Sequence, residues 1–110
     1  MAEPKIINAN FGEHATKFAQ ITNDVLFGDV WERDELGKRE RSLITVAALI
    51  AMNRSEQQLV FHLERALENG VTKDELYEAV THLAFYSGWP CAVSALQILN
   101  HLTQEADPVT

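Results

Sequence analysis

Two histidines on predicted helices are the first candidates for chemistry in this sequence. His62 lies in "FHLERALENGV", and His82 follows twenty residues later in "YEAVTHLAFYSGWPC". Glu78, His82 and Tyr86 recur at intervals of four residues, so a helix places them along one side. A carboxylate one turn from an imidazole raises its pKa and fixes its tautomer, while a phenol can orient or donate a proton. We therefore take His62 and His82 as candidate acid–base catalysts, with Glu78 as the orienting group.

The same residues also have a purely structural interpretation. His62 lies on the flank of an apolar stripe formed by Leu59, Leu63, Ala66 and Leu67, where a histidine is commonly a hydrogen-bonded packing residue. The polar triplet on the following helix equally fits a solvated face with pairs four residues apart. Spacing alone does not decide between these interpretations.

A basic segment and an isolated tryptophan are candidate substrate contacts. "KRERS" at 38–42 brings charge to the start of a predicted helix, where Arg39 or Arg41 can hold a carboxylate through paired hydrogen bonds. We take Arg41 as the substrate-binding residue. Trp31 lies in the connection "FGDVWERDEL", where we expect an exposed or ligand-facing side chain.

Tyr86 and Cys91 complete the candidate substrate contacts. Cys91 follows Pro90 at the start of a predicted helix, where backbone amides and the helix dipole lower the pKa of a thiol. The structural alternative is a small packing residue, because a lone cysteine beside an apolar face is usually buried and inert.

Composition excludes several classes of protein. The 110 residues fit a single domain, and 9 basic against 16 acidic residues give a net charge of −7, which opposes binding to nucleic acid or an anionic membrane. A single cysteine and an N-terminus without a secretory signal indicate a cytoplasmic protein. The apolar run "LITVAALIAM" covers ten residues, about half of a membrane span. Without metal-ligand spacing or a nucleotide-binding motif, we expect no metal and no cofactor.

Five helices with short turns must position these side chains. Apolar spacing predicts helices at about 13–27, 38–52, 55–69, 73–87 and 90–103. Ser55 with Gln58, and Thr72 with Glu75, form capping-box patterns, and Gly70 suits a helix end. The helix at 38–52 is apolar around nearly its whole circumference, so we expect other helices to surround it. The prediction is an all-α domain over 1–110 with loosely ordered tails at 1–12 and 104–110.

The motifs together resemble the carboxymuconolactone decarboxylase family. The similarity covers about residues 25–99 and includes "RSLITVAAL", the "FHL…ALENGVTKDEL" unit and the "HLAFYSGWP" turn. It implies an alkylhydroperoxidase-like bundle that assembles into a symmetric homo-oligomer, a trimer or more often a hexamer, with pockets between subunits. It also implies a cofactor-free lyase of aromatic catabolism, which removes carbon dioxide from γ-carboxymuconolactone with His62, His82 and an arginine as the working groups.

A second branch of this family has peroxiredoxin activity through a Cys-x-x-Cys pair. In this sequence Arg54 or Ser55 and Gln57 or Gln58 take the places of those cysteines, and Ser42 stands near the position of that branch's glutamate. Because dithiol chemistry needs both a nucleophilic and a resolving thiol, the departure disfavours peroxide reduction. A non-catalytic, ligand-binding oligomer on the same scaffold is the other alternative.

Overall fold

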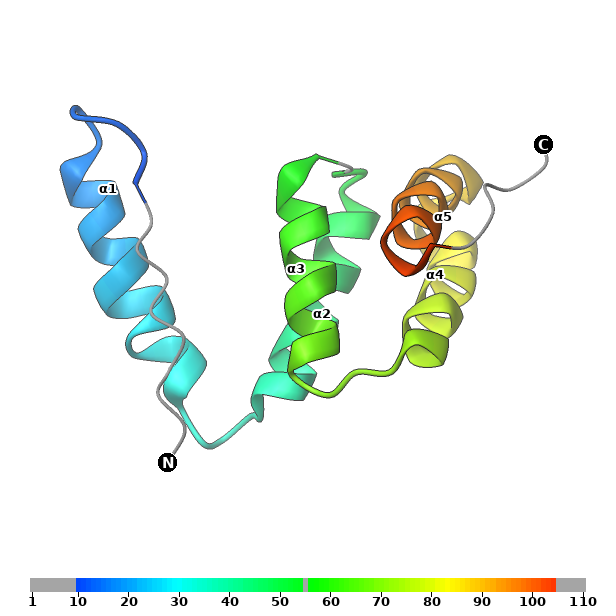
Figure 1. Cartoon of the computed structure of the whole chain (residues 1–110), viewed down its shortest axis with the longest axis horizontal. Coiled ribbons are helices and arrows are strands. Elements are labelled where there is room, and N and C mark those ends of the chain that lie inside the picture. Colours follow the sequence, from blue (N-terminus) through cyan, green and yellow to red (C-terminus); the bar gives the residue numbers. More distant parts are fainter. Residues whose placement is uncertain (1–9, 55, 105–110) are drawn as a thin grey trace. The chain divides into compact units, whose positions relative to one another are not determined.

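The computed structural model describes residues 10–54 and 56–104, which are helical without any strand. The elements are α1 (Thr16–Ile21), a π-helical turn η1 (Thr22–Phe27), a 3₁₀ turn η2 (Val30–Glu32), α2 (Lys38–Ala51), α3 (Gln57–Glu68), α4 (Lys73–Ser87) and α5 (Trp89–Thr103) (Figure 1). The predicted all-α fold of five main helices is therefore confirmed. Two compact units meet in the sequence between Lys38 and Arg39.

The N-terminal unit contains a helical segment at 16–27, where a helix at 13–27 was predicted. Neither α1 nor η1 has a buried residue, and the side chain of Phe18 is 60% exposed. Trp31, by contrast, is only 7% exposed. Its ring lies 6.1 Å from that of Phe27, so the indole packs as a core residue. The exposed alternative predicted for Trp31 is therefore wrong, and the ligand-facing alternative stays a prediction.

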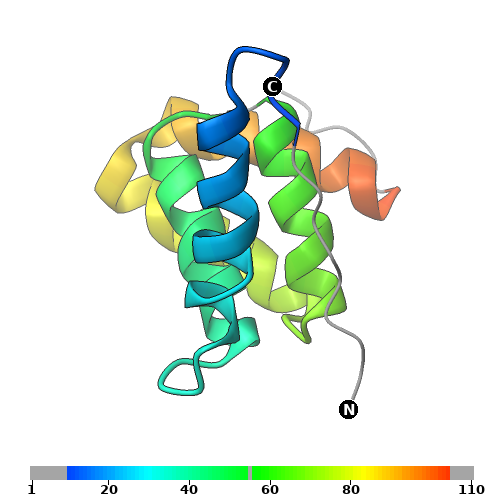
Figure 2. The ribbon, with the colours of Figure 1, turned by 90° about the vertical axis from the view of Figure 1, so that its left-hand side faces the viewer.

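In the C-terminal unit, α2 and α3 form an antiparallel pair, seen beside each other in Figure 2. The amide Nδ2 of Asn69, at the end of α3, donates to Oγ of Ser42 near the start of α2 over 2.9 Å. Ser42 is fully buried, but Ile44 is 57% exposed. Ile44 on α2 is therefore open in the single chain, and the expectation that other helices surround α2 stays a prediction.

The two ends of α3 are capped differently. Ser55, the predicted cap, lies outside the described residues, and Glu56 precedes the helix without a capping side-chain hydrogen bond. At the other end Gly70 has φ +100°, and the amide of Val71 donates to the carbonyl of Ala66 over 2.9 Å. This arrangement is a Schellman motif, which only a residue without a Cβ adopts at low cost. The predicted role of Gly70 is confirmed.

Helix α4 begins with the predicted capping box. Oγ1 of Thr72 accepts from the amide of Glu75 over 3.1 Å, and the Glu75 carboxylate accepts from the amide of Thr72 over 2.9 Å. Gly88, with φ +104° and ψ 150°, separates α4 from α5, and Pro90 lies in the first turn of α5. Because Gly88 occupies a region nearly restricted to glycine, the chain reverses within one residue.

Helix α5 packs against both α4 and α3. The shared core contains thirteen buried side chains: Val46, Leu49, Ile50, Leu59, Leu63, Ala66, Val71, Leu76, Val80, Ala84, Ala92, Ala95 and Leu99. Burying a large aliphatic side chain contributes about 1.5–3 kcal/mol each. A polar contact also joins these helices, because the Tyr77 hydroxyl of α4 donates to Oδ1 of the buried Asn100 of α5 over 2.6 Å. Within residues 10–54 and 56–104, no helix has the length and apolar character to cross a membrane.

Candidate functional site

His62 is a half-buried residue on α3. Its ring meets the ring of Phe61 edge-on at 5.0 Å, and its Nδ1 atom is buried. Burial lowers the pKa of the imidazole below its ordinary value of 6.5, and the positive charge of Arg65 lowers that pKa further. At neutral pH the side chain is therefore uncharged, with one nitrogen that donates and one that accepts a hydrogen bond.

This environment suits acid–base chemistry. A neutral imidazole can accept a proton, and its N–H can stabilise negative charge that develops on a substrate oxygen. Partial burial reduces the contact of the ring with water, which strengthens such a hydrogen bond. His62 keeps the candidate role that its sequence position predicts.

His82 has a different environment on α4. It is exposed, and its ring stacks on that of Tyr86 at a centroid distance of 4.8 Å. Glu78 is also exposed, and within the described part of the chain no ion pair joins it to His82. The side chains of His82 and Tyr86 therefore meet on α4, but the contact at His82 is with the phenol of Tyr86 and not with Glu78.

A second aromatic contact extends this face towards α5. Phe85 and Trp89 meet at 6.0 Å, with their rings nearly perpendicular. Phe85 is 75% exposed, Tyr86 78% and Trp89 63%, which is unusual for three neighbouring aromatic side chains. Contiguous exposed apolar surface of this kind commonly marks an interaction site.

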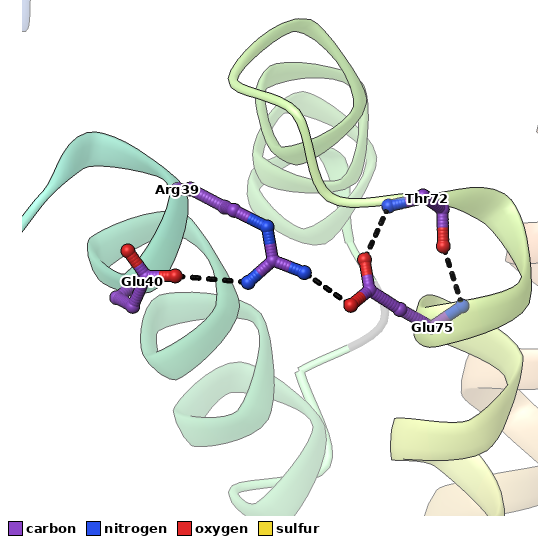
Figure 3. A network of polar contacts seen from close by, with 4 residues as sticks. All are labelled: Arg39, Glu40, Thr72 and Glu75. Carbon is purple, nitrogen blue, oxygen red and sulfur yellow. Dashed lines mark hydrogen bonds and ion pairs between the residues drawn. The ribbon is translucent and has the colours of Figure 1, made fainter.

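Arg39, one of the two candidate arginines near the start of α2, lies in a network of ion pairs. Arg39 binds Glu40 of its own helix at 2.8 Å and also pairs with Glu75 of α4 (Figure 3). The backbone amide of Thr72 and the Arg39 guanidinium together lower the pKa of Glu75. Because this network fastens α2 to the cap of α4, Arg39 has a structural role. Arg41 is partly buried on α2 and stays the predicted carboxylate ligand.

Cys91 is a half-buried, free thiol in the first turn of α5. Its place at the start of the helix agrees with the prediction, but the geometry does not distinguish a substrate contact from a packing residue. Trp31 lies in the N-terminal unit and the other candidates lie in the C-terminal unit. Both residues stay predictions as substrate contacts.

Two apolar hollows flank α5. One, of about 280 Å³, lies against α3 and is lined by Val60, Gln97, Ile98, His101 and Leu102. The other, of about 150 Å³, lies against α4 and is lined by Tyr77, Val80, Thr81, Ala84, Trp89, Ala92, Val93 and Leu96. Neither lining includes His62 or His82. These hollows do not bring the two candidate catalysts together.

Arg65 is the neighbour of His62 that the sequence argument missed. It follows His62 by three residues and Phe61 by four, and its Cζ lies 5.6 Å from the centroid of the Phe61 ring. Residues three and four apart are neighbours on a helix surface, so the spacing itself contains the signal. The guanidinium covers part of Phe61, which is 38% exposed.

Comparison with known proteins identifies the family. A family model described as the carboxymuconolactone decarboxylase family matches residues 16–101, a range that includes parts of both compact units. This chain belongs to the carboxymuconolactone decarboxylase family. The resemblance predicted from the sequence motifs is confirmed, and the helical fold agrees with it.

Two relatives have names that state a reaction. The chain is 36% identical over 96 residues to 4-carboxymuconolactone decarboxylase of Acinetobacter baylyi, an alignment that covers 87% of this chain and 71% of that protein. It is 34% identical over 87 residues to nitrosuccinic acid decarboxylase of Metarhizium robertsii, which covers 76% of this chain and 60% of that protein. The chain thus spans less than two thirds of the second relative. Both similarities support a family member that is an enzyme of the decarboxylase type.

Proposed function

We propose that this protein removes carbon dioxide from a small carboxylated lactone of the γ-carboxymuconolactone type, without an organic cofactor. The family and the two relatives named as decarboxylases support this reaction class. The structural observation that carries the proposal is the half-buried, neutral imidazole of His62. The departure from the Cys-x-x-Cys pattern, with one cysteine in the sequence, weighs against the peroxidase alternative.

The reaction has three requirements. The carbon–carbon bond to the carboxylate breaks, its electron pair moves into the conjugated lactone, and carbon dioxide leaves a dienolate. A proton then binds to carbon and completes the enol-lactone. A catalyst must therefore hold a carboxylate, stabilise the dienolate oxygen and deliver a proton.

Each requirement is assigned to a named side chain. His62 donates its N–H to the oxygen on which the dienolate charge collects, as a neutral imidazole can. Arg41 holds a substrate carboxylate through its guanidinium. His82 delivers the proton to carbon, with its ring oriented by the stacked Tyr86.

Self-association into a symmetric trimer or hexamer is part of the proposal. Phe85, Tyr86 and Trp89 are each more than 60% exposed in the single chain, and His82 lies beside them. A neighbouring copy that covers this face would remove His82 from bulk water and give it the enclosed environment that proton transfer favours. Light scattering tests this part: we expect a trimer or hexamer, whereas a monomer at the assay concentration contradicts it.

The catalytic assignment is tested by decarboxylation of γ-carboxymuconolactone. We expect turnover by the unmodified protein and a loss of roughly 10²- to 10³-fold in kcat for His62→Gln, the range for removal of one hydrogen bond to a developing oxyanion. His82→Gln should also lower kcat. His14→Gln is the matched control, because the side chain of His14 is 93% exposed and has no assigned role.

Two results would contradict the assignment. Unchanged turnover in both His62→Gln and His82→Gln removes these histidines from the reaction. Binding of the lactone without any turnover by the unmodified protein favours a non-catalytic oligomer on the same scaffold.

A further inference from the structure

The hollow between α4 and α5 is separate from the candidate catalytic side chains. Its volume is about 150 Å³, and its lining contains none of His62, His82 and Arg41. An apolar cavity of about this volume is large enough to hold one benzene ring. The hollow therefore has the size of a single small aromatic ring.

The apolar part of the lining comes from both helices. Val80 and Ala84 of α4 and Ala92 of α5 are buried, whereas Val93 is half-buried and Trp89 is 63% exposed. The two alanines present only a methyl group each, and the indole of Trp89 adds an aromatic surface. Aromatic rings pack well against one another in edge-on or offset contacts. The lining thus favours an aromatic ring over a polar group of the same size.

Three lining residues carry polar groups that a ligand can meet. Tyr77 and Thr81, one turn apart on α4, have hydroxyls, and Trp89 has an indole N–H. The Tyr77 hydroxyl donates its proton to Oδ1 of Asn100 over 2.6 Å, and the Thr81 hydroxyl donates to the backbone carbonyl of Tyr77 over 3.0 Å. Each hydroxyl oxygen can therefore accept a further hydrogen bond but has no proton left to donate. A matching ligand donates a hydrogen bond to one of them.

The lining carries no charge. Of its eight residues, all within the described part of the chain, none is Lys, Arg, His, Asp or Glu. An anion moved from water into such a site loses hydration without gaining a cationic partner, and the net charge of −7 adds repulsion. A ring with a carboxylate is thus disfavoured, whereas a neutral ring with an O–H group matches the hollow.

We propose that the hollow between α4 and α5 is a binding site for a small neutral phenol, distinct from the site of decarboxylation. The ring lies against Ala84, Ala92 and the indole of Trp89, and its hydroxyl donates to the hydroxyl oxygen of Thr81. This inference goes beyond the proposed function, because no lining residue takes part in the proposed reaction. The phenol is a free ligand and not Tyr86 of a second copy, since the Tyr86 ring already stacks on His82 of its own chain.

Titration of the full-length protein with simple ring compounds, followed by NMR, tests this site. The probes are phenol, toluene and benzoate, which share one ring and differ in the group attached to it. The indole N–H signal of Trp89 reports binding, and that of Trp31, in the N-terminal unit, is the internal reference. We expect a saturable shift of the Trp89 signal with phenol and none with benzoate. Toluene should bind about fivefold more weakly than phenol, or by about 1 kcal/mol, because it lacks the hydrogen bond.

Substitutions in the two hollows locate the binding site. Thr81→Val removes a hydroxyl at an exposed position and keeps the shape, so phenol should bind about fivefold more weakly and toluene should bind unchanged. Val93→Phe fills the hollow and should abolish saturable phenol binding. Val60→Phe is the matched control, because Val60 is also half-buried but lines the other hollow, against α3, so its phenol affinity should equal that of the unmodified protein. Ala84→Leu replaces Val93→Phe if that variant fails to fold.

The contrary results each overturn a stated part of the proposal. Equal phenol affinity in the unmodified protein and in Val93→Phe overturns the site, and equal affinity in Thr81→Val overturns the assigned hydrogen bond. Benzoate binding as tight as phenol binding overturns the neutral class of ligand. Absence of saturable phenol binding by the unmodified protein overturns the proposal, and binding that appears only in Tyr86→Ala then identifies a tyrosine of a neighbouring copy as the occupant. Since binding is measured without turnover, these results are independent of lactone decarboxylation.

Discussion

Removal of the Tyr77 hydroxyl tests how α5 is fastened to α4. In the structure this hydroxyl donates to Oδ1 of Asn100 over 2.6 Å and lies 2.8 Å from Oγ1 of Thr103. Thr103 keeps a partner without Tyr77, because its hydroxyl can donate its one proton to the carbonyl of Leu99 over 3.0 Å. Asn100 is only 7% exposed, so Tyr77→Phe leaves its amide oxygen buried without this donor. The expected loss of unfolding free energy is about 1–3 kcal/mol.

Thermal unfolding followed by circular dichroism measures this loss. For a chain of this size each kcal/mol lowers Tm by about 4–8 °C, so a loss of about 1–3 kcal/mol in Tyr77→Phe should lower Tm by roughly 4–24 °C. Thr103→Val keeps the bond between Tyr77 and Asn100 and should cost less than half as much. The double variant Tyr77→Phe/Asn100→Leu removes both polar partners and should recover to within about 1 kcal/mol of the unmodified protein. A Tm for Tyr77→Phe within about 1 °C of the unmodified protein refutes the reasoning.

Three further predictions concern pH and backbone conformation. The folded pKa of Glu75 lies below its ordinary value of 4.5, so the stabilising effect of its carboxylate is present above that pH and is lost as pH falls through the folded pKa. In urea titrations, the free energy of unfolding of Glu75→Gln should therefore fall less steeply at acid pH than that of the unmodified protein. Parallel curves of unfolding free energy against pH would contradict this. The folded pKa of His62 lies below 6.5, so protonation favours the unfolded state and stability falls as pH drops below about 6.5. His62→Gln should flatten this part of the plot of unfolding free energy against pH. An unchanged slope argues against a desolvated imidazole. Gly88 has φ +104°, and a Cβ there would meet only Cδ of Pro90 at 3.8 Å, so the cost of Gly88→Ala is conformational. Urea unfolding should show that Gly88→Ala loses about 1–3 kcal/mol of unfolding free energy. Equal stability of the two proteins would rule out strain at this position.

Local signals account for the elements that the sequence predicted well. The observed bounds of α4, Lys73–Ser87, equal the predicted 73–87. Thr72 with Glu75 determines its start, and Gly88 determines its end. Both devices act within a few residues, so they are visible in the sequence. Gly70 belongs to the same class of signal.

Tertiary neighbours account for what the sequence did not predict. Trp31 lies in a polar, charged connection, yet its ring packs against Phe27 and is buried. The sequence predicts an apolar surface around nearly the whole circumference of α2, but Ile44 is 57% exposed in the single chain. Hydrophobic periodicity shows that an apolar side chain needs a partner, and it does not show which segment supplies that partner.

The candidate site also contains features that the sequence predicted and features that only the structure shows. The sequence placed His62 on the flank of an apolar stripe, and its half-buried environment agrees with that position. Spacing four residues apart suggested a contact between Glu78 and His82, but the imidazole stacks on Tyr86 instead. Both contacts have the same spacing, so periodicity cannot rank them. Arg65 was visible at the right interval from Phe61 and His62, but its contact with the Phe61 ring and its effect on the pKa of His62 follow only from the structure.

The pH dependence of kcat/KM for γ-carboxymuconolactone, measured from pH 5 to 9, tests the central role of His62 most directly. Because burial and Arg65 lower the pKa of His62 below 6.5 and the neutral imidazole is the proposed working form, kcat/KM should rise with pH through that pKa. His62→Gln should lower kcat/KM and abolish the rise. A His62→Gln variant with the kcat/KM and pH profile of the unmodified protein would contradict the proposed mechanism.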